Sequence, residues 1–330
     1  MNNVTINFNE VYLNETSVVG GKNESLKYKD YFDYSVDENK IDQNSSERIE
    51  EYLLKTSLAI LFKKTGDYNP QLFIGGDLSN QLSISSQVGM QLDGSLIGVY
   101  GACSNLILSL ILAGVFISNR AVDNVVTFTS SSYSTSERQF RYPLNYANQK
   151  KETTTITTTG AASGYLSNKK DRIKMVRGTL GKIEDVGWSN VLDMGSPMAF
   201  ACYKTLKAHF ENTNTSPTDY DLIVTGDLSS LGSKILYEMF KYEGIDLYNH
   251  IDCGKMIFNE NKKFFCGGSG CACIGLISFS YVRKMMEKGK YQRVILVGTG
   301  SLHSKISADQ KEDIPVVAHL VELEVNNDLF

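Results

Sequence analysis

The sequence has 330 residues, of which 42% are hydrophobic and 21% are charged, and its formal net charge is −4. This length and composition are those of a globular protein with a large core, long enough for two domains or two fused halves. The slightly acidic balance offers none of the basic excess on which nucleic-acid binding depends, so we expect no nucleic-acid partner.

The sequence pattern of residues 1–76 predicts two strands and one long helix. The first residues are polar and rich in asparagine, without the charged and apolar regions of a signal peptide. Residues 1–45 predict one strand near 14–20 followed by a surface loop. Residues 47–66 carry apolar side chains at helical spacing and precede the apolar segment 71–76, which predicts a helix followed by a strand.

The longest apolar run, residues 106–117, predicts the central buried helix of the fold. A helix that crosses a bilayer needs about 20 apolar residues, so this run is too short and we expect a soluble protein. Residues 153–167 are typical of a strand, a glycine turn and a second strand. A second long helix is predicted at 196–213, with Pro197 in its first turn, and a strand at 221–226 follows it.

Two pairs of matching segments indicate an internal repeat. Residues 73–79 (FIGGDLS) match residues 223–229 (IVTGDLS). Residues 102–131 match residues 272–301, and both read as a helix, a charged turn and a β-branched strand. The chain is therefore predicted to consist of two fused copies of one unit.

The boundary between the copies is predicted near residue 171, which gives an N-terminal half of residues 1–170 and a C-terminal half of residues 171–330. The second copy carries extra residues around 246–264. Helices that alternate with strands in both copies predict an α/β fold with parallel or mixed sheets and buried central helices.

All six cysteines lie in apolar or glycine-rich segments of a chain without a secretion signal, which favours reduced thiols. Cys271 and Cys273 form a C-x-C pair, which is not a zinc or redox spacing, and none of the four histidines is close to it in sequence. We expect neither a metal site nor a cofactor.

Cys103, in the sequence GACSN, precedes the predicted central helix. A helix N-terminus carries unpaired N–H groups, favours anions and lowers the pKa of a thiol. Three interpretations of Cys103 remain open: a nucleophile, a residue that lines an anion pocket, or a small buried residue at a tight junction.

Two fused α/β halves with a cysteine at the start of a buried helix resemble the thiolase fold. The resemblance implies that Cys103 lies where that family has its acylated cysteine. The family's histidine would follow the apolar strand of the second half, where this sequence has Gly226 or Asp227. Its later asparagine or histidine would lie at Gly268 or Ser269. A thiol without a base and oxyanion donors is a poor acyl-transfer catalyst, so we predict a protein that is not an enzyme.

The motifs GACS, ERQFRYP (137–143), DMGS, TGDLS, DCGKMI and GGSGCAC resemble the stage V sporulation protein AD family of endospore formers, over residues 75–319. The resemblance implies a non-catalytic, thiolase-like protein that binds dipicolinic acid, with or without Ca²⁺. It also implies partners among the other stage V sporulation protein A membrane proteins, which take the acid into the developing spore. The protein would be a homodimer held peripherally at the forespore inner membrane through these partners.

Dipicolinate is a planar dianion, so a pocket for it needs N–H donors, guanidinium groups and a flat apolar wall. The glycine-rich turns at 98–104 and 267–273 are expected to place two helix N-termini together, and both favour an anion. The predicted ligand-binding residues are Cys103, Arg138, Arg141, Asp227, Ser229, Gly268, Ser269 and His303.

Several of these residues have a second interpretation. Arg138 and Arg141, in a loop after a strand, also fit ion pairs at a subunit interface. Asp77 and Asp227 follow equivalent strands and also fit helix caps. If Asp227 faces the pocket, its carboxylate would repel an anionic ligand unless Ca²⁺ lies between them or the carboxyl is protonated. The isolated histidines, among them His303 and His319, also fit structural roles.

Three functions remain in competition. The first is the dipicolinate-binding component. The alternative is a degenerate acyl-CoA or acyl-carrier condensing enzyme that uses Cys103, and the third is a scaffold whose old pocket is filled. A cavity beside Cys103 with convergent donors would favour binding over the scaffold.

Overall fold

The computed structural model describes residues 3–41, 45–67, 69–140, 152–258, 266–302 and 304–327, without the side chains of Arg138 and Phe140. In these residues, ten strands form a mixed sheet in the order β11-β10-β13-β14-β9-β2-β8-β6-β4-β5, with β1 added on β9 and β3 on β2. The strands of this sheet are β1 (Val4–Asn7), β2 (Tyr12–Gly21), β3 (Tyr34–Val36), β4 (Leu72–Gly76), β5 (Ser95–Gly98), β6 (Asn124–Ser131), β8 (Gly160–Ser167), β9 (Ile173–Leu180), β10 (Leu222–Thr225), β11 (His250–Asp252), β13 (Arg293–Ser301) and β14 (Val316–Val325). A separate parallel pair joins β7 (Thr155–Thr157) and β12 (Gly267–Ser269).

The strand order on one side of the sheet mirrors the order on the other. From edge to centre, one side runs β5-β4-β6-β8-β2 and the other β11-β10-β13-β14-β9. In each, the two outer pairings are parallel and the inner strand is antiparallel, as β8 is to β6 and β14 to β13. This confirms the predicted mixed α/β fold. The predicted boundary near residue 171 lies in the loop between β8 and β9.

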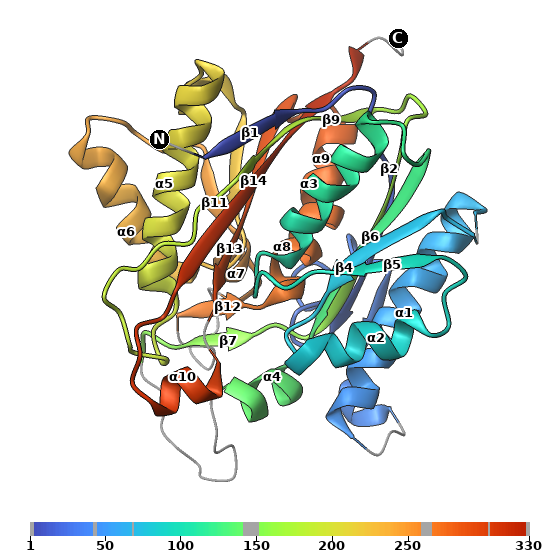
Figure 1. The fold of residues 1–330 in the computed structure, drawn as a ribbon, viewed down its shortest axis with the longest axis horizontal. Coiled ribbons are helices and arrows are strands. Elements are labelled where there is room, and N and C mark those ends of the chain that lie inside the picture. Colours follow the sequence, from blue (N-terminus) through green and yellow to red (C-terminus); the bar gives the residue numbers. More distant parts are fainter. Residues whose placement is uncertain are drawn as a thin grey trace.

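Helices fill the layers between and outside the strands. Figure 1 shows α3, α8 and α9 between the two sides of the sheet, α1 and α2 outside one side, and α5 and α6 outside the other. The helices are α1 (Ser46–Thr65), α2 (Ser83–Gly89), α3 (Asn105–Ser118), α4 (Tyr133–Phe140), α5 (Gly195–Thr213), α6 (Ser229–Tyr242), α7 (Cys253–Phe258), α8 (Cys271–Ile277), α9 (Arg283–Glu287) and α10 (Lys305–Asp309), and a π-helical turn (Ser278–Val282) joins α8 to α9.

The two longest predicted helices and the central one form as expected. The Ser45 side chain accepts the N–H of Arg48 to begin α1, and Gly66, with φ 69°, ends it. Helix α3 is apolar all round and contacts both β6 and β13, so it is the buried centre of the fold. No helix in the described ranges combines the length and apolarity needed to cross a membrane.

Three local predictions were wrong. Residues 3–41 contain three strands rather than one, and β2 is central because it pairs with β8 along its length. Gly160 is the first residue of β8 instead of a turn, since the break between β7 and β8 falls at residues 158–159. Arg138 belongs to helix α4 rather than to a loop.

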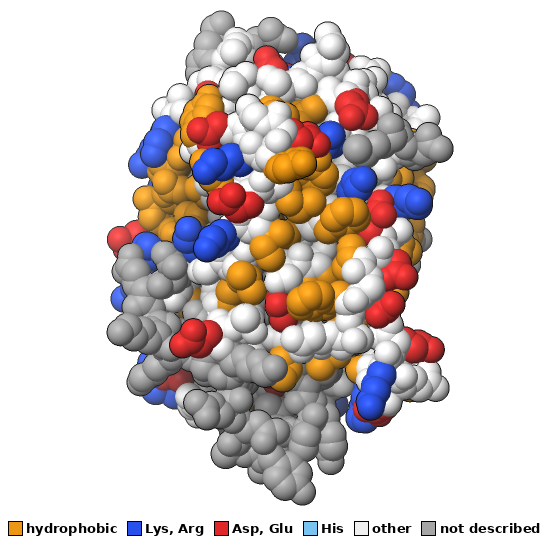
Figure 2. All heavy atoms as spheres, turned by 90° about the vertical axis from the view of Figure 1, so that its left-hand side faces the viewer, with side chains coloured by type: hydrophobic (Ala, Val, Ile, Leu, Met, Phe, Trp, Pro, Cys, Tyr) orange, Lys and Arg blue, Asp and Glu red, His pale blue; other side chains and the backbone are white. Residues whose placement is uncertain are grey.

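Hydrophobic side chains gather on the face that carries α5 and α6 (Figure 2). A groove on this face is lined by Tyr203, Leu231, Lys234, Ile235, Glu238, Met239 and Tyr242. The opposite side of α6 packs Leu236 and Phe240 into the core. Helix α6 is therefore apolar towards solvent as well as towards the protein interior.

Candidate functional site

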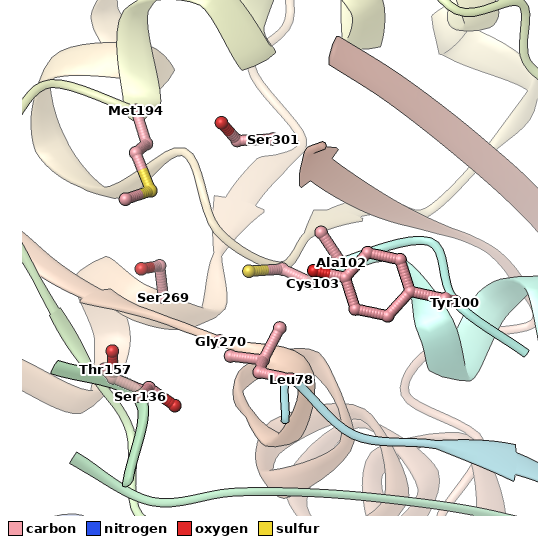
Figure 3. Close-up of a pocket in the computed structure, with 10 residues that line it drawn as sticks. All are labelled: Leu78, Tyr100, Ala102, Cys103, Ser136, Thr157, Met194, Ser269, Gly270 and Ser301. Carbon is pink, nitrogen blue, oxygen red and sulfur yellow. The ribbon is translucent and has the colours of Figure 1, made fainter. Parts of the chain in front are cut away.

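A pocket opens where strand ends and helix starts of both sides of the molecule meet. Its volume is about 390 Å³ including the mouth. Figure 3 shows that its lining residues come from segments far apart in the sequence. They are Leu78, Tyr100, Ala102, Cys103, Ser136, Thr157, Met194, Ser269, Gly270 and Ser301.

Cys103 is almost fully buried, on the turn that leads into α3. The preceding residue, Ala102, has φ 49°, which is a strained conformation for a residue with a side chain. In Figure 3 the Cys103 thiol points to the side of the pocket that carries Ser269 and Met194. Strain of this kind is often found at functional sites, but it also occurs elsewhere in this chain, so the three interpretations of Cys103 remain open.

The starts of α3 and α8 are bonded to each other. The Asn105 side-chain amide donates to Cys271 Sγ at 3.2 Å, and the Cys271 thiol donates to the carbonyl oxygen of Ala102 at 3.0 Å. Both contacts are buried. The predicted convergence of the two helix N-termini is confirmed, and the positive ends of two helix dipoles thus lie beside the pocket.

Hydroxyl groups surround the pocket, and none of its ten lining residues carries a formal charge. Ser136, Thr157, Ser269 and Ser301 supply aliphatic hydroxyls. The Ser269 hydroxyl donates to Thr155 Oγ1 at 3.0 Å, whereas Ser136 Oγ is buried without a hydrogen bond in the described structure. The lining can therefore donate several hydrogen bonds to an oxygen-rich ligand.

The side chains of the predicted cationic residues are not described. Arg141 and His303 are not described, and Arg138 is described only as backbone. Helix α4 nevertheless carries both Ser136, in the pocket lining, and Arg138 two positions later.

Asp227 lies behind the pocket lining. It is fully buried, and its Oδ1 accepts the N–H of Gly270 at 2.9 Å, while its Oδ2 has no hydrogen-bond partner among the described residues. Burial first, and then the neighbouring Asp252 carboxylate, raise the pKa of Asp227 well above its usual value. The protonated, neutral form is therefore favoured, and the side chain holds the start of α8 in place.

Asp227 accepts an N–H group at the start of α8, whereas the cap of α6, the helix that follows it in sequence, is Asp252. Asp252, at the end of β11, accepts the N–H groups of Leu228 at 3.0 Å and Ser229 at 2.9 Å at the start of α6. Ser229 has φ 55°, and its hydroxyl donates to the carbonyl oxygen of Gly268 at 2.6 Å, so it supports the pocket wall from behind. Asp77 has the predicted cap-like role, since its carboxylate accepts the N–H groups of Ser79 and Ser85 near α2.

Gly226 and Gly268, each one of two candidates for a thiolase partner position, are tightly packed. A Cβ on Gly226 would lie 2.9 Å from Cβ of Ile274, and a Cβ on Gly268 would lie 2.8 Å from Cγ2 of Thr158. Both distances are shorter than normal carbon–carbon contacts. A side chain at either glycine would therefore collide with a neighbour.

The described histidines do not line this pocket. His319, in β14, accepts the N–H of Gly181 at its Nδ1 at 3.1 Å, and burial lowers its pKa to about 4. His319 is therefore structural. In the described part of the chain all six cysteines are free thiols, and no three His, Cys, Asp or Glu side chains are grouped as a metal site.

Only Cys103 and Ser269 of the ten lining residues were predicted. Sequence reasoning missed the other eight, which are Leu78, Tyr100, Ala102, Ser136, Thr157, Met194, Gly270 and Ser301. Thr157 and Ser301 end strands β7 and β13, and strand ends are where α/β proteins place ligand sites, so that signal was available. Ser136 and Met194 come from helix α4 and the residue before α5, and nothing in the sequence links those places to Cys103.

Comparison with known proteins assigns both family and fold. The sequence profile described as stage V sporulation protein AD matches residues 2–324. The stage V sporulation protein AD of Bacillus subtilis (strain 168) is 36% identical over 319 residues, which cover 95% of this chain and 94% of that protein.

Among solved structures, cerulenin-bound OleA of Xanthomonas campestris is similar with a TM-score of 0.64 and 13% identity, covering 97% of this chain and 98% of that chain. An OleA variant with bound lauric acid and lauroyl-CoA has a TM-score of 0.60 and 13% identity, covering 96% and 99%. At this level of identity the likeness shows a thiolase-like fold.

Proposed function

This chain belongs to the stage V sporulation protein AD family, and we propose that it serves sporulation by binding dipicolinate in the pocket beside Cys103, without catalysis. The observation that carries the proposal is the pocket itself. It joins two helix N-termini to a ring of hydroxyl donors and has no negative charge in its described lining.

The pocket must widen to admit the ligand. Its volume of about 390 Å³ includes the open mouth, so the part that can enclose a ligand is smaller. Met194 and Leu78 are its most adaptable apolar lining residues, because their side chains change rotamer without losing a hydrogen bond. Their displacement would open a flat apolar slot for the pyridine ring.

Charge compensation for the dianion comes, in this proposal, from Arg138, Arg141 and His303, or from Ca²⁺ bound with the ligand. The raised pKa of Asp227 supports the proposal, since a neutral carboxyl behind the lining does not repel the dianion.

Packing at the two glycines supports a non-catalytic role. If Gly226 and Gly268 are the partner positions, any side chain there would collide with Ile274 or Thr158. The alternative is a condensing enzyme that uses Cys103, and the strained backbone at Ala102 is the observation in its favour.

The assembly is also a proposal. We infer a homodimer that works with other stage V sporulation protein A membrane proteins, is held at the forespore inner membrane through them and has no nucleic-acid partner. The family assignment supports these partners.

The test is calorimetric titration with dipicolinate, with and without Ca²⁺. Thr157→Val replaces a pocket hydroxyl by a methyl group of the same size, and Thr218→Val is the matched control on the surface. We expect saturable binding that Thr157→Val weakens about tenfold and Thr218→Val leaves unchanged. Arg141→Ala tests the guanidinium in the same way.

Incubation with lauroyl-CoA, followed by mass spectrometry, tests the alternative. Acylation that is lost in Cys103→Ala, without dipicolinate binding, would establish the enzyme. If the chain neither binds dipicolinate nor is acylated, the scaffold hypothesis is the one that remains.

A further inference from the structure

The apolar groove on helices α5 and α6 shares no lining residue with the Cys103 pocket. Its volume is about 930 Å³, open mouth included, and hydrophobic side chains gather on the face around it (Figure 2). The Tyr242 side chain is 93% exposed, although α6 already buries Leu236 and Phe240 on its other side. A helix with a second apolar stripe towards solvent is suited to contact another molecule.

Two charged side chains of the groove make no ion pair within the described structure. Lys234 and Glu238 are exposed, and both belong to the groove lining. They are four residues apart on α6 with the lysine first, which is the weaker order for a pair within one helix. Glu243, by contrast, is already bound by Lys207 at 2.7 Å. Among the described residues of the groove, a cation and a carboxylate are therefore available to a partner.

Apolar and aromatic side chains flank these two charges. Ile235 and Met239 line the groove from α6, and Tyr203 lines it from α5. Methionine and aromatic residues are enriched in the cores of protein interfaces. The stripe from Leu231 to Tyr242 covers about three helical turns, or about 16 Å. The groove therefore suits a protein helix better than a small polar ligand.

The order of the side chains along α6 is complementary to itself. A second α6 can lie antiparallel on the first, with a two-fold axis level with Leu236. Lys234 of each copy then faces Glu238 of the other, so the same ion pair forms twice. Leu231 and Tyr242, at the two ends of the stripe, are brought together across the same axis. A contact of this kind is isologous, because one patch serves both copies.

We propose that the groove is the contact between two copies of this chain, with their α6 helices antiparallel and the pair between Lys234 and Glu238 formed twice. Such a contact closes at two copies and does not extend into a filament. The proposal rests on the homodimer inferred above and gives it an interface. Dipicolinate binding does not depend on it, because the two sites have separate linings.

The experiment measures the mass of the full chain in solution, by light scattering and sedimentation velocity over a range of concentrations. Lys234→Glu and Glu238→Lys each place like charges opposite one another twice, so each should weaken dimerisation by about tenfold or more. Both substitutions on one chain restore opposite charges, so the double variant should dimerise like the wild type. Lys288→Glu, at an exposed lysine after α9, is the matched control and should change nothing.

Tyr242→Ser tests the apolar part of the contact. The side chain is 93% exposed, so its removal should leave the fold intact and act on association alone. We expect dimerisation to weaken by about tenfold, because aromatic side chains at the centre of an interface carry much of its binding energy.

The outcomes separate this interface from the other proposals. A dimer that survives both single charge reversals would overturn the interface and leave the homodimer standing, whereas a chain that is monomeric at every concentration would overturn both. A double variant that fails to recover would show that the two side chains do not face each other. A monomer that binds lipid vesicles through Tyr242 would assign the groove to a membrane surface instead. Lys234→Glu should titrate with dipicolinate as the wild type does, so a failure here is distinct from one at Cys103.

Discussion

The same four residues, Gly-Asp-Leu-Ser, lie at the C-terminal ends of strand β4 (76–79) and of strand β10 (226–229), mostly beyond the last strand residue, yet the two aspartates have different surroundings. Asp77 accepts the N–H and hydroxyl groups of both Ser79 and Ser85. Asp227 accepts from Gly270 and leaves Oδ2 without a partner among the described residues.

The contrast shows how the two copies of a duplicated segment take different structural roles. In the first half the aspartate is a saturated cap. In the second half Asp252 has taken the capping position of α6, and Asp227 holds the α8 turn that lines the Cys103 pocket. Four predictions would break or sharpen this comparison.

The largest effect is expected from Asp77→Ala. The substitution leaves four buried donors of Ser79 and Ser85 without an acceptor, which should lower the free energy of unfolding by about 3–5 kcal/mol. Asp227→Ala removes one such contact and should cost about 1–2 kcal/mol. Urea denaturation measures both, and equal losses would refute the contrast between the two aspartates.

Gly226→Ala is expected to have the next largest effect. The new methyl group would lie 2.9 Å from Cβ of Ile274, so overpacking should lower the free energy of unfolding by about 1–3 kcal/mol. Gly226→Val places a larger side chain at the same position and should lose more in the same denaturation experiment. If Gly226→Ala costs nothing, the backbone moves to admit the methyl group and the position is not tightly packed.

Asp227→Asn should change the pH dependence of stability. The raised pKa of Asp227 means that the folded chain keeps a proton that the unfolded chain releases above about pH 4. The wild type should therefore lose stability relative to the variant as pH rises, by up to about 1.4 kcal/mol per pH unit until the folded pKa is reached. Parallel stability curves from pH 4 to 8 would show that the carboxyl is ionised in the fold.

The smallest effect is expected from Ser229→Ala. It removes the hydrogen bond to the Gly268 carbonyl and should cost about 1 kcal/mol. Ser229→Gly loses the same bond but relieves the left-handed backbone at φ 55°, so its cost should be smaller. A larger loss for glycine than for alanine would mean that the backbone there is unstrained.

Sequence reasoning predicted the fold because the fold depends on periodic patterns. Two of these patterns are local: the amphipathic segment 47–66 and the apolar run 106–117, and each forms the expected helix. The repeat is a comparison of such local patterns between the two halves. The pocket depends on contacts between distant residues instead. Asp252, the residue that caps α6, lies on strand β11, and Met194 reaches the pocket from the start of α5. No local sequence pattern encodes either contact.

The packing around Gly226 and Gly268 also constrains how this lineage can change. A histidine at one position and an asparagine at the other would each collide with a neighbour, so neither is an accessible first step by itself. A larger residue at either position is therefore tolerated only together with a second change that moves or removes the neighbouring atom. The two glycines are expected to change in pairs with their neighbours rather than alone.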